Sequence, residues 1–226
     1  MGILNKKKLT RSLFYYLAEI VIVVAGIFIA ILLNNWNEQR KKEEDSQQSL
    51  KRIATDLRTE KFVLNQFKKQ LSHSRKYLKD IIYYDKKDHL DSLYFHLNHA
   101  FRHYKMNAEY INLKYSGKLG LIPNDVLRYN IVNYYEVYYA LYQEISEGHK
   151  KFVNEDLHQY LQKEFPSDTT YLADAKLVKQ KLKDPTLVNL VKDQITTYGY
   201  LNQRIQTTLI DTLLKRIKKE MPSTKK

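Results

Sequence analysis

The chain has 226 residues, no cysteine and a net charge of +13, because 38 Lys and Arg outnumber 25 Asp and Glu. The absence of cysteine excludes disulfides, thiolate catalysis and cysteine-ligated zinc. The positive charge favours anionic partners such as lipid headgroups, acidic glycans or nucleic acid, although a solvated helical surface with a few extra lysines explains it more simply.

An uninterrupted apolar run occupies residues 13–33 and contains one charge, Glu19. A helix of this length spans about 30 Å, which is the thickness of the hydrocarbon core of a bilayer. The run is longer than the apolar part of a signal peptide, and no small-residue cleavage site follows it. It therefore predicts an uncleaved transmembrane helix over residues 13–34, with Trp36 as an interfacial anchor.

Lys and Arg flank this span in similar numbers on both sides, so charge counting alone does not orient it. A short tail with several cations is costly to translocate, whereas long domains cross largely regardless of charge. Residues 1–12 are therefore predicted to be a basic cytoplasmic tail. Residues 35–221 are predicted to form a helical domain outside, with a long stalk-like first helix, and residues 222–226 a disordered basic tail.

One face of the predicted span combines a carboxyl group with small residues. Glu19, Val23, Gly26 and Ala30 follow one another at three- and four-residue steps. A small-xxx-small pair allows a second helix to approach closely, and a carboxyl group in the span is costly unless it is protonated, paired or turned toward protein. The pattern favours association with copies of the chain or another membrane protein. In the alternatives, Glu19 reaches the headgroups by tilting, or it lines a proton or ion path.

Two stretches resemble a known family. Residues 18–38 read AEIVIVVAGIFIAILLNNWNE, and the second stretch, residues 113–135, contains Ser116-Gly117, Leu119, Leu121-Ile122, Asn124, Leu127-Arg128 and Tyr134-Tyr135. Both are similar to signatures of an uncharacterised family of single-span membrane proteins, labelled a domain of unknown function and common in Bacteroidota. The resemblance implies a bacterial membrane setting and no catalytic residue. Combined with the orientation predicted above, a bacterial setting places the span in the inner membrane and the domain in the periplasm.

No segment alternates as a strand does, so the predicted fold class is all-α: one N-terminal transmembrane helix continuing into an antiparallel helical bundle. The first helix is expected to run from about residue 36 to 84. Its leucines recur every seven residues, the a/d pattern of coiled coils, at Leu50, Leu57, Leu64, Leu71 and Leu78. Polar Glu60 and Ser74 share this stripe, which favours one helix of a bundle over a two-stranded zipper.

Further helices are predicted over residues 89–115, from residue 124 or 125 onward, and over 185–217. The expected signals are Gly117 as a C-cap, Asn124 or Asp125 as an N-cap, and Asp184-Pro185 as a helix start. Gly148 and Phe165-Pro166 are expected to interrupt the chain. The predicted apolar stripe of the third helix consists of Leu127, Ile131, Tyr134, Tyr138, Leu141 and Ile145.

Histidine and tyrosine supply the candidate chemistry. His96, His99 and His103 have spacings that can share a metal, but they are predicted to project from the apolar stripe toward solvent as a plain polar face. Nineteen tyrosines are present. Tyr135, Tyr139 and Tyr142 step off the predicted core stripe, so they either edge the core or form an aromatic groove for a glycan, peptide or partner helix.

No enzyme motif is found: Ser116-Gly117-Lys118 lacks the rest of a phosphate-binding loop, and neither HExxH nor GxSxG occurs. No nucleic-acid module is recognisable either, so no cofactor and no nucleic acid are expected. The sequence predicts a non-enzymatic scaffold, sensor or accessory subunit of an envelope complex, associating through its span, with membrane lipid and a second membrane protein or copy as partners. The alternatives are an oligomeric transport or channel component using Glu19, and an enzyme using the histidine face.

Overall fold

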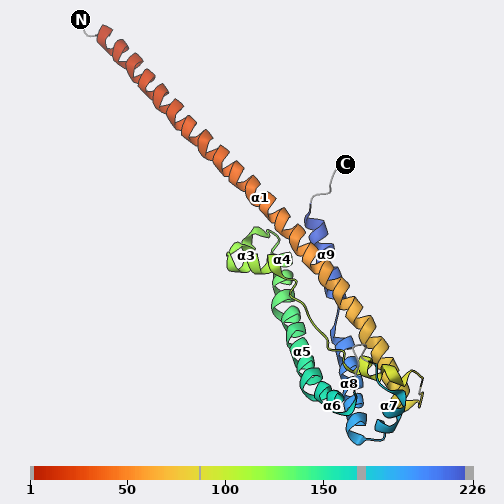
Figure 1. Ribbon diagram of the computed structural model, residues 1–226. Helices are drawn as coiled ribbons and strands as arrows, with labels where there is room; N and C mark the ends of the chain where they lie inside the picture. Colours follow the sequence, from red (N-terminus) through yellow and green to blue (C-terminus); the bar gives the residue numbers. More distant parts are fainter. Residues whose placement is uncertain (1–2, 87, 167–171, 222–226) are drawn as a thin grey trace. The chain divides into compact units, whose positions relative to one another are not determined.

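The computed structural model describes residues 3–86, 88–166 and 172–221, and within these ranges it contains helices and no strand. The all-α fold class is therefore confirmed. The chain divides into two compact units, Met1–Gln48 and Ser49–Lys226, and Figure 1 shows the helices of each. The tail predicted over residues 222–226 lies outside the described residues.

The first unit consists of the N-terminal part of helix α1 (Ile3–Tyr83). Its apolar segment, near the N-terminus, is long and apolar enough to cross a membrane, and none of the residues in that apolar window is buried. Large apolar side chains such as Ile22, Phe28 and Leu32 are all more than half exposed. These properties are consistent with a single-pass membrane protein.

In the second unit the remainder of α1 supplies one wall of a hydrophobic core. Leu50, Leu57, Leu64, Leu71 and Leu78 are all at most 2% exposed. The heptad stripe therefore faces the core as predicted, because residues seven apart return to the same side of a helix after two turns. The two polar members of this stripe, Glu60 and Ser74, are buried with it.

The second unit continues with short helical pieces and then two long helical runs. The elements are η1 (Leu90–Ser92), α2 (Leu93–Leu97), α3 (Ala108–Tyr115), η2 (Lys118–Leu121), α4 (Asp125–Asn133), η3 (Tyr134–Tyr139), α5 (Ala140–Lys151), η4 (Phe152–Leu157), α6 (His158–Glu164), α7 (Ala175–Lys181), α8 (Pro185–Arg204) and α9 (Thr208–Glu220). Their buried apolar residues join those of α1 in one core cluster.

Three predicted helix boundaries are confirmed by their capping geometry. The side chain of Asn124 accepts a hydrogen bond from the N–H of Leu127 at 2.9 Å, and that of Asp184 accepts one from Thr186 at 2.9 Å. Pro185 occupies the first turn of α8, as expected for a residue without an N–H. Gly117 follows the end of α3 with φ of +69°, a conformation that favours glycine.

The helix predicted over residues 89–115 is wrong. α2 ends at Leu97 and α3 begins at Ala108, and between them residues 98–107, here called the linking segment, form no helix. Phe101 within the segment is fully buried, and it follows Leu93 and Leu97 at steps of four residues, a spacing that predicts a helix. The structure departs from that reading because the backbone of this segment bonds to side chains of other helices instead of to itself.

The predicted stripe of the third helix shifts by one residue after Tyr134. Tyr139, Tyr142 and Ser146 are buried, whereas Tyr138, Leu141 and Ile145 are only half-buried. The cause is η3, a π-helix over Tyr134–Tyr139, because its wider turn inserts an extra residue into the α-helical register.

Gly148 does not interrupt the chain, since α5 continues through it and a second π-helix, η4, leads into α6. Nothing lies within 4 Å of a Cβ built at Gly148, so the position has room for any small residue and requires no bend. The interruption expected at Phe165-Pro166 is confirmed by the end of α6 at Glu164.

The single helix predicted over residues 185–217 is two helices. α8 ends at Arg204, Ile205 is extended, and α9 begins at Thr208. Two side chains stabilise the break: the Tyr142 hydroxyl accepts a hydrogen bond from the N–H of Gln206 at 3.1 Å, and Lys68 donates to the carbonyl of Ile205 at 3.0 Å. Satisfied backbone groups make this interruption stable.

Candidate functional site

A buried pair of ionisable side chains lies where α1 meets the linking segment. Glu60 of α1 and His103 of the segment place Oε1 and Nε2 3.0 Å apart, and their side chains are 1% and 2% exposed. On the other side of the imidazole, the Gln143 amide nitrogen lies 2.5 Å from Nδ1 and also donates to the His103 carbonyl. Because an amide N–H can only donate, this arrangement assigns the proton to Nε2, which donates to Glu60.

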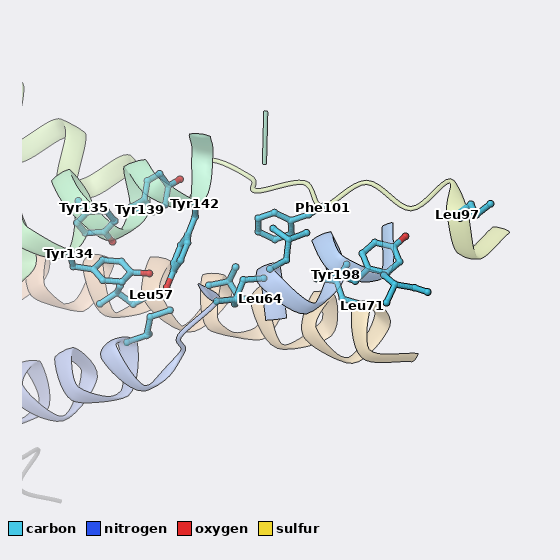
Figure 2. Packing of buried hydrophobic residues seen from close by; sticks show 14 of the residues in the cluster. Leu57, Leu64, Leu71, Leu97, Phe101, Tyr134, Tyr135, Tyr139, Tyr142 and Tyr198 are labelled. Carbon is cyan, nitrogen blue, oxygen red and sulfur yellow. The ribbon is translucent and has the colours of Figure 1, made fainter. Parts of the chain in front are cut away.

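Four tyrosines of η3 and α5 lie near this pair, and Figure 2 shows how they pack: Tyr134, Tyr135, Tyr139 and Tyr142. Burial raises the pKa of Tyr134 and Tyr135, and the neighbouring Glu60 carboxyl raises both further. Burial likewise raises the pKa of Tyr139 to about 12. At neutral pH these phenols are therefore protonated.

One face of the η3–α5 run binds the backbone of the linking segment. The His149 Nδ1 accepts a hydrogen bond from the N–H of Phe101 at 2.8 Å. Ser146 accepts from the N–H of His103 at 2.8 Å and donates to the carbonyl of Phe101 at 3.1 Å. At the end of the segment, the Tyr139 hydroxyl accepts from the N–H of Met106 at 2.6 Å. These bonds replace those that a helix would have made internally.

Helix α8 binds the end of α2 and the start of the linking segment, where the Tyr198 hydroxyl also lies 3.0 Å from the carbonyl of His99. Gln194 donates to the carbonyl of Leu97 at 2.7 Å, and the Tyr198 hydroxyl donates to the carbonyl of His96 at 2.8 Å. The Gln194 oxygen lies 3.0 Å from Nε2 of His149, so the amide joins the two helices across the segment. Burial lowers the pKa of His149, which favours the neutral ring that this network needs.

Sequence reasoning missed Gln143, Ser146, His149 and Gln194. The first three follow Tyr139 at steps of four, three and three residues, a polar stripe at helical spacing. Polar residues at that spacing usually face solvent, and here they are turned inward because they bind the backbone of the linking segment. The stripe itself was the available signal.

The prediction that His96, His99 and His103 form one solvent-facing polar surface is wrong. His96 is 5% exposed and its Nδ1 lies 3.0 Å from the Ser74 hydroxyl, while His103 is held by the Glu60 carboxyl. His99 is half-buried against Phe95, with 4.6 Å between ring centroids. The helix that would have aligned them ends at Leu97, so their sequence spacing places them in different surroundings.

Burial lowers the pKa of His96 to about 4, with smaller contributions from the neighbouring His73 and His99. Within the part of the chain that the structure describes, no three His, Asp or Glu side chains form a group that could hold a metal ion. The weak metal candidates His96, His99 and His103 are therefore not gathered into a site.

The proposed aromatic groove of Tyr135, Tyr139 and Tyr142 is also corrected. All three are at most 4% exposed, because the π-helix turns them into the core instead of along its edge. Tyr110 stacks on Tyr135 with 4.5 Å between ring centroids and closes this region from α3. The three rings offer no open surface to a ligand.

The face proposed for association in the span is exposed along its whole length. Glu19, Val23, Gly26 and Ala30 are all exposed, and nothing lies within 4 Å of a Cβ built at Gly26. Glu19 and Val23 line a shallow hollow of about 230 Å³ together with Tyr16, Ile20 and Val24. The carboxyl group therefore lies beside a surface depression.

Comparison with known proteins adds one match. A family model described as a family of unknown function (DUF6090) matches residues 19–199. No curated protein and no solved structure matches the chain. The matched range includes Glu19, the buried Glu60–His103 pair and most of α8.

Proposed function

The chain belongs to this family of unknown function, and we propose that it works as a non-enzymatic membrane-anchored interaction protein that associates through its span. The proposal places the span in a bacterial inner membrane, the N-terminus in the cytoplasm and the helical domain in the periplasm. It is a scaffold, sensor or accessory subunit whose partner is a second copy or another membrane protein.

The observation that supports this function is the uncovered face of the span. A glutamate, exposed in the isolated chain, shares a stripe with Gly26 and Ala30, which leave room for a second backbone. In lipid an unpartnered carboxyl is costly, and small residues permit the close packing that drives helix association. A second helix would therefore both cover the small residues and supply a partner for Glu19.

The helical domain supports a binding role more than a catalytic one. The groups best suited to acid–base chemistry are Glu60, His103 and His149. The side chains of the first two are at most 2% exposed, His149 is 4% exposed, and all three form hydrogen bonds within the domain. A general acid or base must reach a substrate within hydrogen-bond distance. These groups instead hold the linking segment in place.

The test is association of the full chain in a membrane. Glu19→Leu and Gly26→Leu should each weaken self-association or partner capture, while Val21→Leu, on the opposite face of the helix, should not. Gly26→Leu acts by bulk and Glu19→Leu by loss of a polar contact, so the two separate close packing from pairing. Unchanged association in both variants would contradict the proposal.

Orientation is tested separately by C-terminal fusions to alkaline phosphatase and to a fluorescent protein that reports the cytoplasm. Phosphatase activity would support a periplasmic domain. A fluorescent fusion without phosphatase activity would reverse the proposed topology while leaving association through the span intact.

A second candidate function, transport or conduction, follows from the same exposed Glu19. An oligomer could line a proton or ion path with this carboxyl group. Proton- or ion-dependent flux in liposomes that Glu19→Gln abolishes would favour this function. Flux that is absent, or equal in both proteins, would contradict it.

A further inference from the structure

A basic pocket lies between the C-terminal part of α1 and helix α8, away from the buried polar pair. It has a volume of about 340 Å³ and is lined by Ser72, Arg75, Lys76, Lys79, Asp80, Tyr84 and Asn202. This volume is within the range of small-molecule sites, roughly 300–1,000 Å³. The Asn202 amide donates to the Ser72 hydroxyl at 3.0 Å and so connects the two walls.

The Arg75 side chain is held in place by the backbone of α8. Its Nε donates to the carbonyl of Ile195 at 3.1 Å. The guanidinium also lies directly on Gly199, where an added Cβ would be 2.9 Å from Nε and 2.9 Å from Nη2. A glycine at this position therefore lets the guanidinium approach the helix, and its other N–H groups remain for a ligand. An arginine fixed in advance loses less side-chain entropy on binding.

The pocket gathers positive charge that the protein does not neutralise. Ser72, Arg75, Lys76 and Lys79 follow the i, i+3, i+4, i+7 pattern of one helix face. Among the residues with described positions, none of these three cations forms an ion pair, and the lining carboxylate, Asp80, lies 3.6 Å from Lys86. Like charges one helical turn apart destabilise a helix, and a bound anion would relieve that repulsion.

A second cavity strengthens the positive field at the same end of α1. It has a volume of about 380 Å³ and borders residues 81–83, and its charged lining residues are Lys179, Lys183, Lys192 and one carboxylate, Asp85. Clustered cations raise the local concentration of anions even where they make no direct contact.

We propose that the Arg75 pocket binds a phosphate group, either of a soluble phosphorylated compound or of a phospholipid headgroup. A fixed guanidinium matches the geometry of two phosphate oxygens, and two lysines balance the remaining charge. The Ser72 hydroxyl and the Asn202 amide are neutral hydrogen-bonding groups on the opposite walls. This proposal concerns a different part of the chain from the span and does not depend on association there.

The first experiment titrates the full chain in detergent micelles with inorganic phosphate and with pyrophosphate, by calorimetry, and compares chloride at equal ionic strength. Saturable binding of phosphate or pyrophosphate but not chloride is expected. Gly199→Ala should weaken it about tenfold or more, since the added methyl displaces the guanidinium and a charge-assisted bond is lost. Gly148→Ala is the matched control, because that helical glycine has nothing within 4 Å.

Lys79→Gln is the second variant, which keeps the proposal testable if Gly199→Ala does not fold. It should also weaken binding, while far-UV circular dichroism and the melting temperature stay close to those of the parent. Binding that is equal in the parent, Gly199→Ala and Lys79→Gln would overturn the proposal, as would equal binding of chloride.

Vesicles distinguish the two sources of phosphate. The chain in neutral nanodiscs is mixed with vesicles of phosphatidylcholine alone or with added phosphatidylglycerol, and cosedimentation is measured. Binding to the anionic vesicles that Gly199→Ala reduces, without saturable binding of free phosphate, identifies a headgroup site. Saturable phosphate or pyrophosphate binding without vesicle binding identifies a soluble ligand. If the chain binds neither free phosphate nor anionic vesicles, the proposal is overturned.

Discussion

The two parts of α1 differ in how their apolar residues are arranged and exposed. In the apolar segment of the first unit, Ile22 is 72% exposed and apolar residues lie on all sides of the helix. In the second unit, Leu64 is fully buried and apolar residues return every seventh position. An all-round apolar surface suits a hydrocarbon environment, whereas an apolar stripe suits a protein partner on one side only. The arrangement of apolar residues therefore distinguishes a segment apolar enough to cross a membrane from one that faces a protein core.

The carboxyl groups of the two parts also differ in exposure and pairing. Glu19 in the first unit has an exposed carboxyl beside a shallow hollow. Glu60 in the second unit is buried, and its partner, His103, comes from the same chain. A buried carboxyl group paired with an imidazole fixes a contact within the domain, whereas an exposed one remains open to the association proposed above.

The largest effect should come from cutting the core stripe while sparing the span. Leu64→Ala removes a fully buried side chain and should lower the free energy of unfolding by about 2–5 kcal/mol. Leu32→Ala, at a position that is 64% exposed, should leave the helical domain unchanged. Urea unfolding of the full chain in detergent, followed by far-UV circular dichroism, measures both. Equal losses would break the comparison.

A smaller effect on stability is expected from removing a polar side chain that hydrogen-bonds the backbone of the linking segment. Ser146→Ala removes the acceptor of the His103 N–H and the donor to the Phe101 carbonyl. It should cost about 1–3 kcal/mol, because a buried N–H is left without a partner. Thr55→Ala removes only an exposed bond to the Lys51 carbonyl and is the control. Faster amide exchange of residue 103 in Ser146→Ala alone would sharpen the assignment, and unchanged stability would contradict it.

A turn glycine should matter less than either. Gly117→Ala places a Cβ on a residue with φ of +69° and should cost about 1 kcal/mol of unfolding free energy. Gly148→Ala, in the middle of a helix with free space, should be neutral or stabilising by up to about 1 kcal/mol. A thermal melt of both variants tests this difference in sign, and a loss at Gly148 would contradict the account of α5.

The smallest effect is a dependence on pH. Burial lowers the pKa of His96 to about 4, so the unfolded chain binds a proton more readily than the folded one as pH falls below the ordinary histidine value. Stability should fall with the pH, by less than about 1 kcal/mol from this residue between roughly pH 7.5 and 6.0. His96→Gln should flatten that dependence in urea unfolding. An unchanged slope would show that other groups cause it.

Several features of the domain could be predicted because local patterns determine them. The seven-residue leucine stripe, the caps at Asn124 and Asp184, and the left-handed Gly117 each depend on neighbours within a turn or two of chain. The end of α8 at Arg204 could not be predicted in this way. It depends on Tyr142 and Lys68, which are distant in sequence and reach the break only in the folded domain.

The polar site shows the same division more sharply. The sequence placed His103 on an exposed helical face, and the structure buries it against Glu60 because the helix ends before it. It placed Tyr139 and Tyr142 off the core, and one π-helical turn brings them in. A π-turn adds a single residue, which no apolar period reveals beforehand.

The sequence by itself determined the helical class, the apolar segment long enough to span a membrane, and the core face of α1, because all three depend on composition and on periodicity within one element. Only the tertiary structure decided where the linking segment leaves the helix, which polar side chains bind its backbone, and how Gly199 admits Arg75 to the basic pocket. Those outcomes depend on contacts between residues far apart in the chain, where a bond lost within a helix is regained from another helix.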